Sequence, residues 1–336
     1  MENQNFKNLI IKRKKWIQSS KENKFDFDGI FTGIYNDPSH FIFEILQNAE
    51  DANASSISFM LYFDRLEIEH NGREFDFRDV DGITGIGIST KKDDLNSIGK
   101  FGVGFKSVFA ITKTPIIHSG YYHFKIEYFV IPSLLNKNNS NETIFILPFN
   151  HPTRLKDEVY DILRVKLENL SLKNFLFLKS IVDIKWETPE KKGHYYKKFE
   201  DFHKNNLVKK VTIVSKIGDE ENYEKYIVFK KQSKIDTKLF VEVAYRIDDS
   251  ENFSFIKEKN ANLFVYFPTE KVTYLNFIIH GPYKTTQNRE NIPLNDEQNM
   301  FLLEETANLV AESISIIKDL GLLNISFLEV LPIDKV

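Results

Sequence analysis

The 336-residue sequence contains no cysteine. This absence excludes disulfide bonds, thiolate metal sites and a cysteine nucleophile. No stretch reaches the roughly 18 apolar residues that a membrane-spanning helix needs, so no membrane partner is expected. The basic segment 1–24 has neither a continuous apolar run nor a small-residue cleavage site, which argues against a secretory signal. A cytoplasmic location is therefore expected.

The chain also has little net charge, with 45 basic and 48 acidic residues and a formal net charge of −3. No global attraction to nucleic acid follows from this balance, although a local basic patch stays open. Hydrophobic residues make up 42% and charged residues 28%, as in an ordinary globular protein. The length suffices for two domains. The segment 188–193 combines proline, glycine and charge, and it predicts a boundary between domains at 1–190 and 191–336.

Hydrophobic periodicity predicts a mixed α/β protein. Helices are expected over 41–54, 156–169 and 298–320. Strands are expected over 56–63, 66–69, 114–130, 143–149 and 181–186, then over 208–216, 226–230, 239–246, 263–267 and 275–279. One apolar stripe of the last helix is predicted to face the core: Leu303, Ala307, Val310, Ile314 and Ile317.

The first predicted helix carries three polar side chains on one face. At about 100° per residue, Asn48 lies roughly 40° from Glu44, and Asp51 lies roughly 20° from it on the other side. The opposite half of the helix is apolar. A solvated surface helix has the same pattern, so the face alone does not establish a site.

About fifty residues later comes a glycine-rich run: Gly99, Lys100, Phe101, Gly102, Val103, Gly104, Phe105, Lys106 and Ser107. Glycines at this spacing let backbone N–H groups close around phosphate oxygens. Residues 105–112 are expected to form a helix whose N-terminus faces the same anion. The alternative is an ordinary set of turns. The run lacks the ending of a P-loop and the context of a dinucleotide fingerprint.

Together these segments resemble the GHKL ATPase superfamily of gyrase B, MutL, the ninety-kilodalton heat-shock chaperone and histidine kinases. The sacsin-like branch is the most similar, through residues 41–52, His70-Asn71-Gly72 and residues 98–109. The resemblance covers residues 27–149 firmly and 239–332 more loosely. It implies a two-layer α/β sandwich of the Bergerat type, with a mixed sheet backed by helices on one face. A β-rich α/β transducer-like domain is expected to follow.

The resemblance implies that ATP and Mg²⁺ are the cofactors. Glu44 would be the general base that orients and deprotonates the attacking water. Asn48 would supply an oxygen to Mg²⁺. Asp51 would order water or fix the helix against the pocket.

The glycine run would form the lid of the site. Gly99, Gly102 and Gly104 would cap the phosphates, and Lys100 and Lys106 would add positive charge. Lys91, with Ser89 and Lys92, lies in the expected mobile part of the lid, where a plain solvated loop is the alternative. Thr143 matches the family's threonine near the adenine.

One position departs from the family's pattern. The aspartate that accepts a hydrogen bond from the adenine amino group is missing, and His70 and Asn71 stand in its place. Either of them, or Asp79 or Asp81, is a candidate replacement, although Asp79 is also a plausible helix cap. The departure affects the expected base specificity and leaves phosphate binding unaffected.

The second domain offers a polar loop, 280–290, after an apolar strand. In the family, a transducer residue senses the γ-phosphate, and by resemblance Lys284 or Arg289 would do so, as an arginine finger does. An ordinary basic loop is the alternative.

The sequence thus indicates an ATP-driven conformational switch at the front of a longer protein, either a sacsin-like chaperone or a bacterial defence protein. The resemblance implies dimerisation in the ATP-bound state and further domains or partner proteins. A DNA-acting ATPase of the gyrase or MutL kind is an alternative, but its basic surface or nuclease domain is not apparent. A nucleotide sensor that does not hydrolyse is another, although Glu44 argues against it.

Overall fold

The computed structural model describes residues 2–23, 38–85, 104–202, 207–286, 291–293 and 295–332. The chain divides into two compact units. The first comprises Met1–Leu170 and Lys179–His194, and the second comprises Ser171–Leu178 and Tyr195–Val336. The predicted boundary lies between residues 190 and 191. The chain passes into the second unit at 194–195, after an earlier excursion over 171–178.

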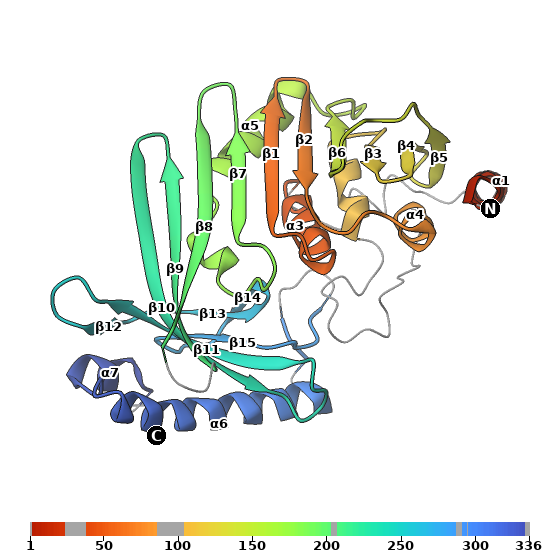
Figure 1. Ribbon diagram of the computed structural model, residues 1–336. Helices are drawn as coiled ribbons and strands as arrows, with labels where there is room; N and C mark the ends of the chain where they lie inside the picture. Colours follow the sequence, from red (N-terminus) through yellow and green to blue (C-terminus); the bar gives the residue numbers. More distant parts are fainter. Residues whose placement is uncertain are drawn as a thin grey trace. The chain divides into compact units, whose positions relative to one another are not determined.

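The first unit contains a mixed sheet with the strand order β7-β1-β2-β6-β3-β4-β5 (Figure 1). β1 runs parallel to β7, and the other neighbouring strands are antiparallel. Alternating burial along β1 directs Ile57, Phe59 and Leu61 into the core. The strands are β1 (Ser56–Tyr62), β2 (Arg65–His70), β3 (Ile116–Ser119), β4 (Tyr122–Glu127), β5 (Ile131–Leu134), β6 (Thr143–Pro148) and β7 (Asp183–Glu187).

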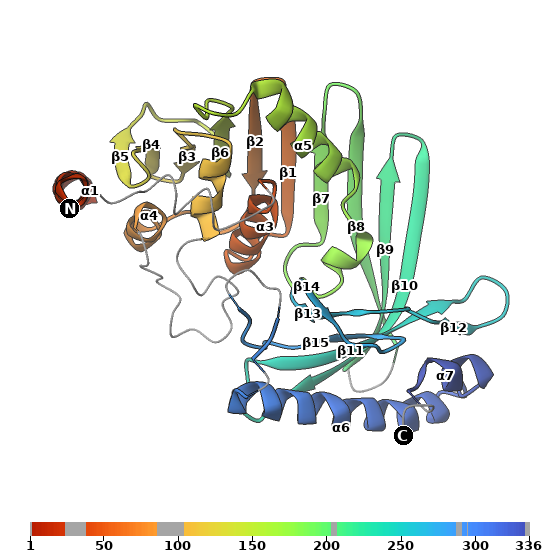
Figure 2. The same ribbon diagram turned by 180° about the vertical axis from the view of Figure 1, so that it is seen from behind.

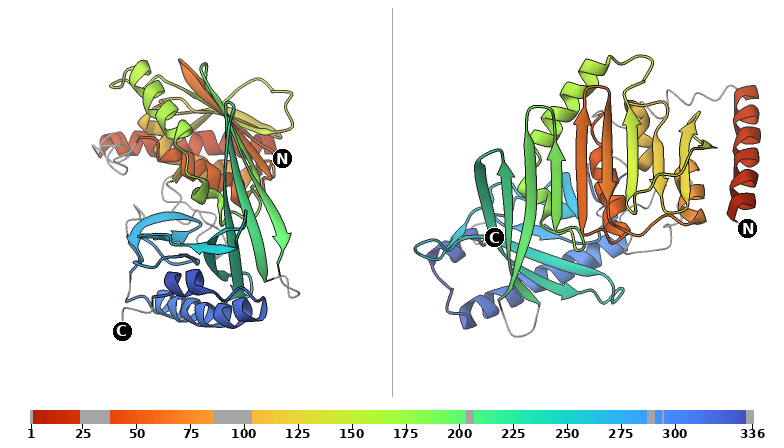
Figure 3. Two further views of the ribbon diagram at one scale, coloured as in Figure 1. Left: turned by 90° about the vertical axis from the view of Figure 1, so that its left-hand side faces the viewer. Right: turned by 45° about the horizontal axis from the view of Figure 1, so that its top comes forward.

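The helices of this unit include the two that were predicted, α3 (Phe41–Asp51) and α5 (Lys156–Glu168). The edge-on view in Figure 3 shows both on the same side of the sheet. Periodicity did not predict α1 (Glu2–Glu22) or α4 (Phe77–Thr84). The expected helix over 105–112 is a seven-residue 3-10 helix, η1 (Gly104–Ala110). The mixed α/β architecture is confirmed.

The second unit has a sheet with the order β14-β13-β15-β11-β10-β9-β8, and β12 pairs with β11. β13 and β15 are parallel. α6 (Glu297–Asp319) packs against β10 and β11, and Figure 2 shows it running along this sheet. The other elements are η2 (Leu172–Phe175), β8 (Lys192–Asp201), β9 (Val208–Ile217), β10 (Glu220–Gln232), β11 (Phe240–Asp248), β12 (Ser254–Ile256), β13 (Asn262–Val265), β14 (Phe267–Val272), β15 (Ile278–His280) and α7 (Ile325–Val330).

The buried face of α6 differs from the predicted stripe. It includes Leu302, Thr306, Leu309 and Ser313 together with Ile317, which was predicted. The predicted Ala307 is exposed, and Leu303 is only half-buried. None of the helices in the described ranges is long and apolar enough to cross a membrane.

Candidate functional site

Helix α3 presents Glu44 from its first turn. Ile42, Leu46 and Ala49 are fully buried on the opposite side, and this packing fixes the rotation of the helix about its axis. The Glu44 side chain is 13% exposed, and its Oε1 lies 3.5 Å from Nε2 of His40. His40 was not among the predicted site residues. Its position four residues before Glu44, where helical side chains meet, is the signal that would have identified it.

The carboxylate of Glu44 lies against the backbone of Gly104, the first residue of η1. A Cβ built on Gly104 would overlap Oε2 and would lie 2.9 Å from Cδ of Glu44. Only glycine therefore leaves room for the carboxylate in its present position. The structure thus brings together two predicted site residues that are sixty positions apart in the sequence.

Asn48 and Asp51 are each half-buried, one and two turns after Glu44 on α3. This agrees with a polar face that is neither packed in the core nor fully solvated. Within the described ranges, no group of three or more His, Asp or Glu side chains is arranged to hold a metal ion. The expected Mg²⁺ contact needs only one protein oxygen, because phosphates and water supply the other ligands. It stays a prediction.

The end of α3 is held against the segment that follows β2. The N–H of Arg73 donates to the Ala52 carbonyl at 2.8 Å. A Cβ on Gly72 would lie 2.9 Å from Cβ of Ala52 and 3.0 Å from its carbonyl oxygen. Glycine at position 72 is therefore required by this close approach. It keeps the sequence His70-Asn71-Gly72 beside the helix that carries Glu44.

His70, the last residue of β2, is predicted to stand where the GHKL pattern has an aspartate. Its side chain is buried, and its Cα pairs with that of Thr143 on β6. Burial lowers the pKa of His70 from 6.5 to about 4, so the imidazole is neutral at pH 7. Its Nδ1 accepts a hydrogen bond from the N–H of Gly72 at 3.1 Å, which assigns the ring proton to Nε2.

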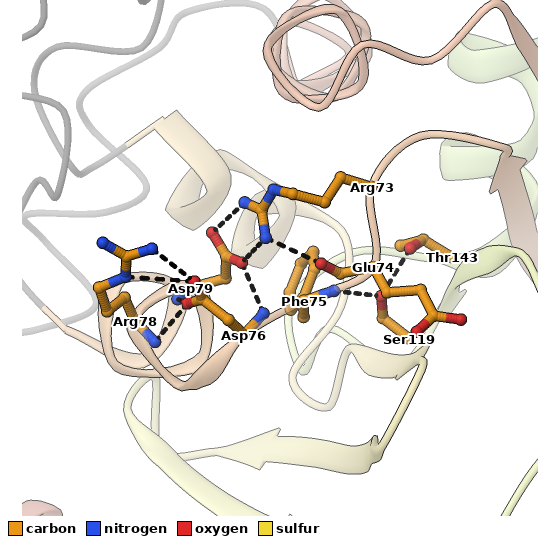
Figure 4. A network of polar contacts seen from close by, with 8 residues as sticks. All are labelled: Arg73, Glu74, Phe75, Asp76, Arg78, Asp79, Ser119 and Thr143. Carbon is orange, nitrogen blue, oxygen red and sulfur yellow. Dashed lines mark hydrogen bonds and ion pairs between the residues drawn. The ribbon is translucent and has the colours of Figure 1, made fainter.

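The other three candidates for the adenine contact are engaged elsewhere. Oδ1 of Asn71 accepts from the backbone N–H groups of residues 55 and 56, at 2.8 and 3.0 Å. Asp79 binds both guanidinium N–H groups of Arg73 and accepts from the Asp76 N–H in a capping box at the start of α4 (Figure 4). Asp81 pairs with Arg13 at 2.6 Å. In the structure these three side chains make other contacts, and a contact of any of them with the base stays a prediction.

Thr143 is fully buried, and its hydroxyl takes part in a short chain of hydrogen bonds. Its Oγ1 lies 2.6 Å from Oγ of Ser119, which accepts from the N–H of Phe75 at 2.9 Å (Figure 4). Ser119 was not predicted, since a serine at the end of a short strand carries no distinctive signal. These hydrogen bonds link β3 and β6 to the segment after β2.

Phe105 belongs to a buried aromatic cluster centred on Phe145 of β6. Its ring lies 5.7 Å from that of Phe145, which also contacts the rings of His70 at 6.0 Å and Phe75 at 6.2 Å. Phe105 is thus a core residue that anchors η1 on the sheet. Its predicted role in binding is indirect at most, through the position of Gly104.

Lys106 was predicted to add positive charge to the lid, but its side chain is buried in the protein. The side chain is 1% exposed, and its Nζ donates to the carbonyl oxygens of Ile83 at 2.7 Å and Phe129 at 2.5 Å. Burial, together with the charge of Arg13, lowers the pKa of Lys106 well below its ordinary value. The amine therefore joins η1 to the last turn of α4 and to residue 129. It is not available to neutralise a phosphate.

The remaining predicted residues are not tested by the geometry. Lys284, in the second unit, donates from Nζ to Asp296 at 2.7 Å, and its side chain is 47% exposed. Outside the described residues lie Lys91, Gly99, Lys100, Phe101, Gly102, Val103 and Arg289.

Part of the site region matches a known family. Residues 66–127, from β2 to β4, match the Sacsin domain. The chain is 36% identical over 99 residues to Protein NO VEIN of Arabidopsis thaliana, which covers 28% of this chain and 4% of that protein. It is 36% identical over 104 residues to Sacsin of Homo sapiens, covering 25% of this chain and 2% of that protein. The chain therefore spans a few per cent of the length of these relatives.

Among solved structures, the N-terminal domain of a DNA repair protein aligns with a TM-score of 0.45 and 14% sequence identity. The alignment covers 87% of this chain and 100% of that chain. A likeness of this size carries no conclusion about function. The sequence matches, by contrast, relate this chain to the sacsin-like proteins.

Proposed function

We propose that this chain binds ATP at the polar face of α3 and hydrolyses it, as a conformational switch of the GHKL type. In this proposal the first unit is a Bergerat-type nucleotide domain and the second is transducer-like. The observation that carries the proposal is the contact between Glu44 and Gly104. It sets a carboxylate on the helix beside the last glycine of the run that would cap the phosphates.

Glu44 is suited to the role of general base. It is mostly shielded from solvent, so bulk water does not compete strongly for its oxygens. Its Oε2 lies against the Gly104 backbone and its Oε1 faces His40. A carboxylate held in this way is able to orient a water molecule and accept its proton. Asn48, one turn later on the same face, would hold Mg²⁺, which when bound neutralises phosphate charge.

The base-binding end is expected to be less selective than in relatives with an aspartate. His70 is neutral, and its Nδ1 lone pair is already used by Gly72. The ring therefore offers an N–H donor, which suits an acceptor atom of a base better than the adenine amino group. We infer that discrimination between ATP and GTP is weak.

The relationship to sacsin-like proteins favours a switch that acts in a chaperone or a defence protein. A DNA-acting role and a non-hydrolysing sensor remain the rivals. Salt-dependent DNA binding, together with stimulation of hydrolysis by DNA, would favour the first. Nucleotide binding without turnover would favour the second.

The test is a comparison of the parent protein with Glu44→Ala and Asn48→Ala. Calorimetry with ATP, GTP, CTP and UTP, with and without magnesium, measures binding, and phosphate release measures turnover. We expect Glu44→Ala to bind ATP while turnover falls by about 10²-fold or more. Asn48→Ala should lose the magnesium-dependent part of the affinity. Equal turnover in Glu44→Ala and the parent would overturn the assignment of the base.

A further inference from the structure

A second carboxylate of α3, Glu50, points away from the polar face that carries Glu44. Six residues along a helix correspond to a rotation of roughly 120° from Glu44. The Glu50 side chain enters the interior, where the residue is 6% exposed. A buried carboxylate is costly unless hydrogen-bond donors surround it, so its partners indicate what it does.

Glu50 binds three successive backbone amides. Its Oε1 accepts from the N–H of Lys179 at 2.6 Å and of Ser180 at 2.9 Å, and its Oε2 accepts from the N–H of Ile181 at 2.9 Å. Hydrogen bonds to an ionised carboxylate are among the strong ones in proteins. Three of them tie segment 179–181 to α3.

Segment 179–181 directly follows residues 171–178, which belong to the second unit. Residues 171–178 belong to that unit, whereas the residues on either side of them belong to the first. Glu50 therefore holds the chain at the point where it returns. No residue separates the anchored amides from the excursion.

The excursion is itself firmly attached within the second unit. Lys173 forms an ion pair with the buried Glu258, and the carbonyl of Leu178 accepts from Nζ of Lys197. The ring of Phe177 stacks on that of His280, with centroids 4.6 Å apart and an interplanar angle of 12°. His280 ends β15 and leads, four residues later, to Lys284.

We propose that Glu50 couples the helix bearing Glu44 and Asn48 to the second unit, through segment 179–181 and the Phe177–His280 stack. The inference rests on the proposed function, because ATP binding is the event that would displace α3. A shift of the helix is passed through three strong hydrogen bonds to the backbone of 179–181. It then continues along the chain to Phe177 and to the loop that carries Lys284.

The variant Glu50→Gln tests this link. Glutamine keeps the shape of the side chain but replaces one acceptor oxygen by an N–H₂ group, which repels a backbone donor. Glu305→Gln is the matched control, since Glu305 is another buried carboxylate, which accepts from Ser233 and from the Lys234 N–H in the second unit. Both variants are compared with the parent by thermal melting first, so that a folding defect is recognised.

The main measurement is hydrogen exchange of the amides in 171–181 and 278–284, with and without a non-hydrolysable ATP analogue and magnesium. In the parent and in Glu305→Gln, the analogue should change these exchange rates by at least about fivefold, the lower end of ordinary coupling between sites. Glu50→Gln should bind the analogue with an affinity within about threefold of the parent and show no such change. Exchange at 41–51 should respond in all three proteins.

Phe177→Leu provides an independent test if Glu50→Gln is poorly folded. It removes the ring that stacks on His280 while leaving Glu50 and its amides intact. The response should then persist at 179–181 and disappear at 278–284. If the parent binds the analogue but 171–178 does not respond, or if Glu50→Gln responds as the parent does, the coupling role is wrong. Failure of the parent to bind any nucleotide would instead overturn the proposed function.

Discussion

The carboxylate of Glu44 and the backbone of Gly104 are in van der Waals contact, with no room for a Cβ between them. We therefore predict that Gly104→Ala pushes the Glu44 side chain aside. A long side chain yields at its far end, so the free energy of unfolding should change by less than about 1 kcal/mol. Turnover should fall by about 10²-fold, because a displacement of about 1 Å is enough to impair catalysis.

A double-mutant cycle separates this effect from a general disturbance of η1. In the Glu44→Ala background the added methyl group meets no carboxylate, so Gly104→Ala should cause little further loss of turnover. Steady-state phosphate release for the four proteins gives the cycle. Losses that simply multiply in the double variant would show that Gly104 does not act through Glu44.

Lys106 gives the second prediction. Lys106→Met removes the donor to the Ile83 and Phe129 carbonyls and should lower the free energy of unfolding by about 1–3 kcal/mol, the cost of a buried polar group left unpaired. The affinity for ATP should change little, because the amine does not face solvent or a phosphate. Urea denaturation and calorimetry measure the two quantities.

An exposed lysine of the same unit is the matched control for this prediction. The side chain of Lys185 on β7 is 61% exposed, so Lys185→Met should leave both stability and affinity near the parent values. If Lys106→Met instead weakened ATP binding tenfold and left stability unchanged, the charge of Lys106 would act on the nucleotide. That result would restore the role expected from the sequence.

Lys106 also shows which part of the site could be predicted from the sequence and which part could not. The spacing of Glu44, Asn48 and Asp51 follows from helical geometry, so their common face was predictable. The direction of the Lys106 side chain depends on where Ile83 and Phe129 lie after folding, and no local pattern encodes that. A lysine beside a glycine run has the same sequence signal whether it faces a phosphate or the core.

Helix α6 shows a related limit. Its length was predicted well, but its buried face was shifted to Leu303, Val310 and Ile314. Thr306 and Ser313 lie inside because their hydroxyls bond with those of Tyr283 and Tyr245, at 2.8 and 2.9 Å. Hydrophobic periodicity treats such residues as polar. The predicted buried face of α6 is therefore displaced toward their apolar neighbours.

The buried imidazole of His70 predicts acid sensitivity. Its pKa of about 4 in the folded state lies below the ordinary value of 6.5, so the unfolded chain binds the proton more readily. Stability is therefore intact above pH 6.5 and is lost as the pH falls toward 4. Each pKa unit corresponds to about 1.4 kcal/mol, so the full loss is about 3 kcal/mol.

His70→Asn isolates this contribution, because the asparagine Oδ1 takes the place of Nδ1 and is able to accept from Gly72 but does not titrate near neutral pH. Urea unfolding at several pH values between 7.5 and 4.5 gives the free energies. As the pH falls, the free energy of unfolding should decrease more in the parent than in the variant. His118 and His123, whose pKa values are also lowered by burial, are present in both proteins and cancel in the comparison. Parallel pH profiles would contradict the prediction.

The ion pair between Lys284 and Asp296 predicts a gain of activity. Asp296 is the N-cap of α6 and accepts from the N–H groups of Gln298 and Asn299. Asp296→Asn keeps an equally good cap but removes the charge that holds Lys284. An exposed ion pair is worth about 0.2–1 kcal/mol. If Lys284 senses the γ-phosphate, as the resemblance implies, its release should raise kcat/KM by up to about fivefold.

Lys284→Ala and the double variant decide whether the gain comes from the lysine. Lys284→Ala should lower turnover more than it lowers the affinity for ATP. When Lys284→Ala is present, adding Asp296→Asn should not change turnover further. Asp296→Asn should leave the melting temperature nearly unchanged, because the N-cap of α6 is retained. If Lys284→Ala turns over ATP at the parental rate, the loop does not sense the phosphate.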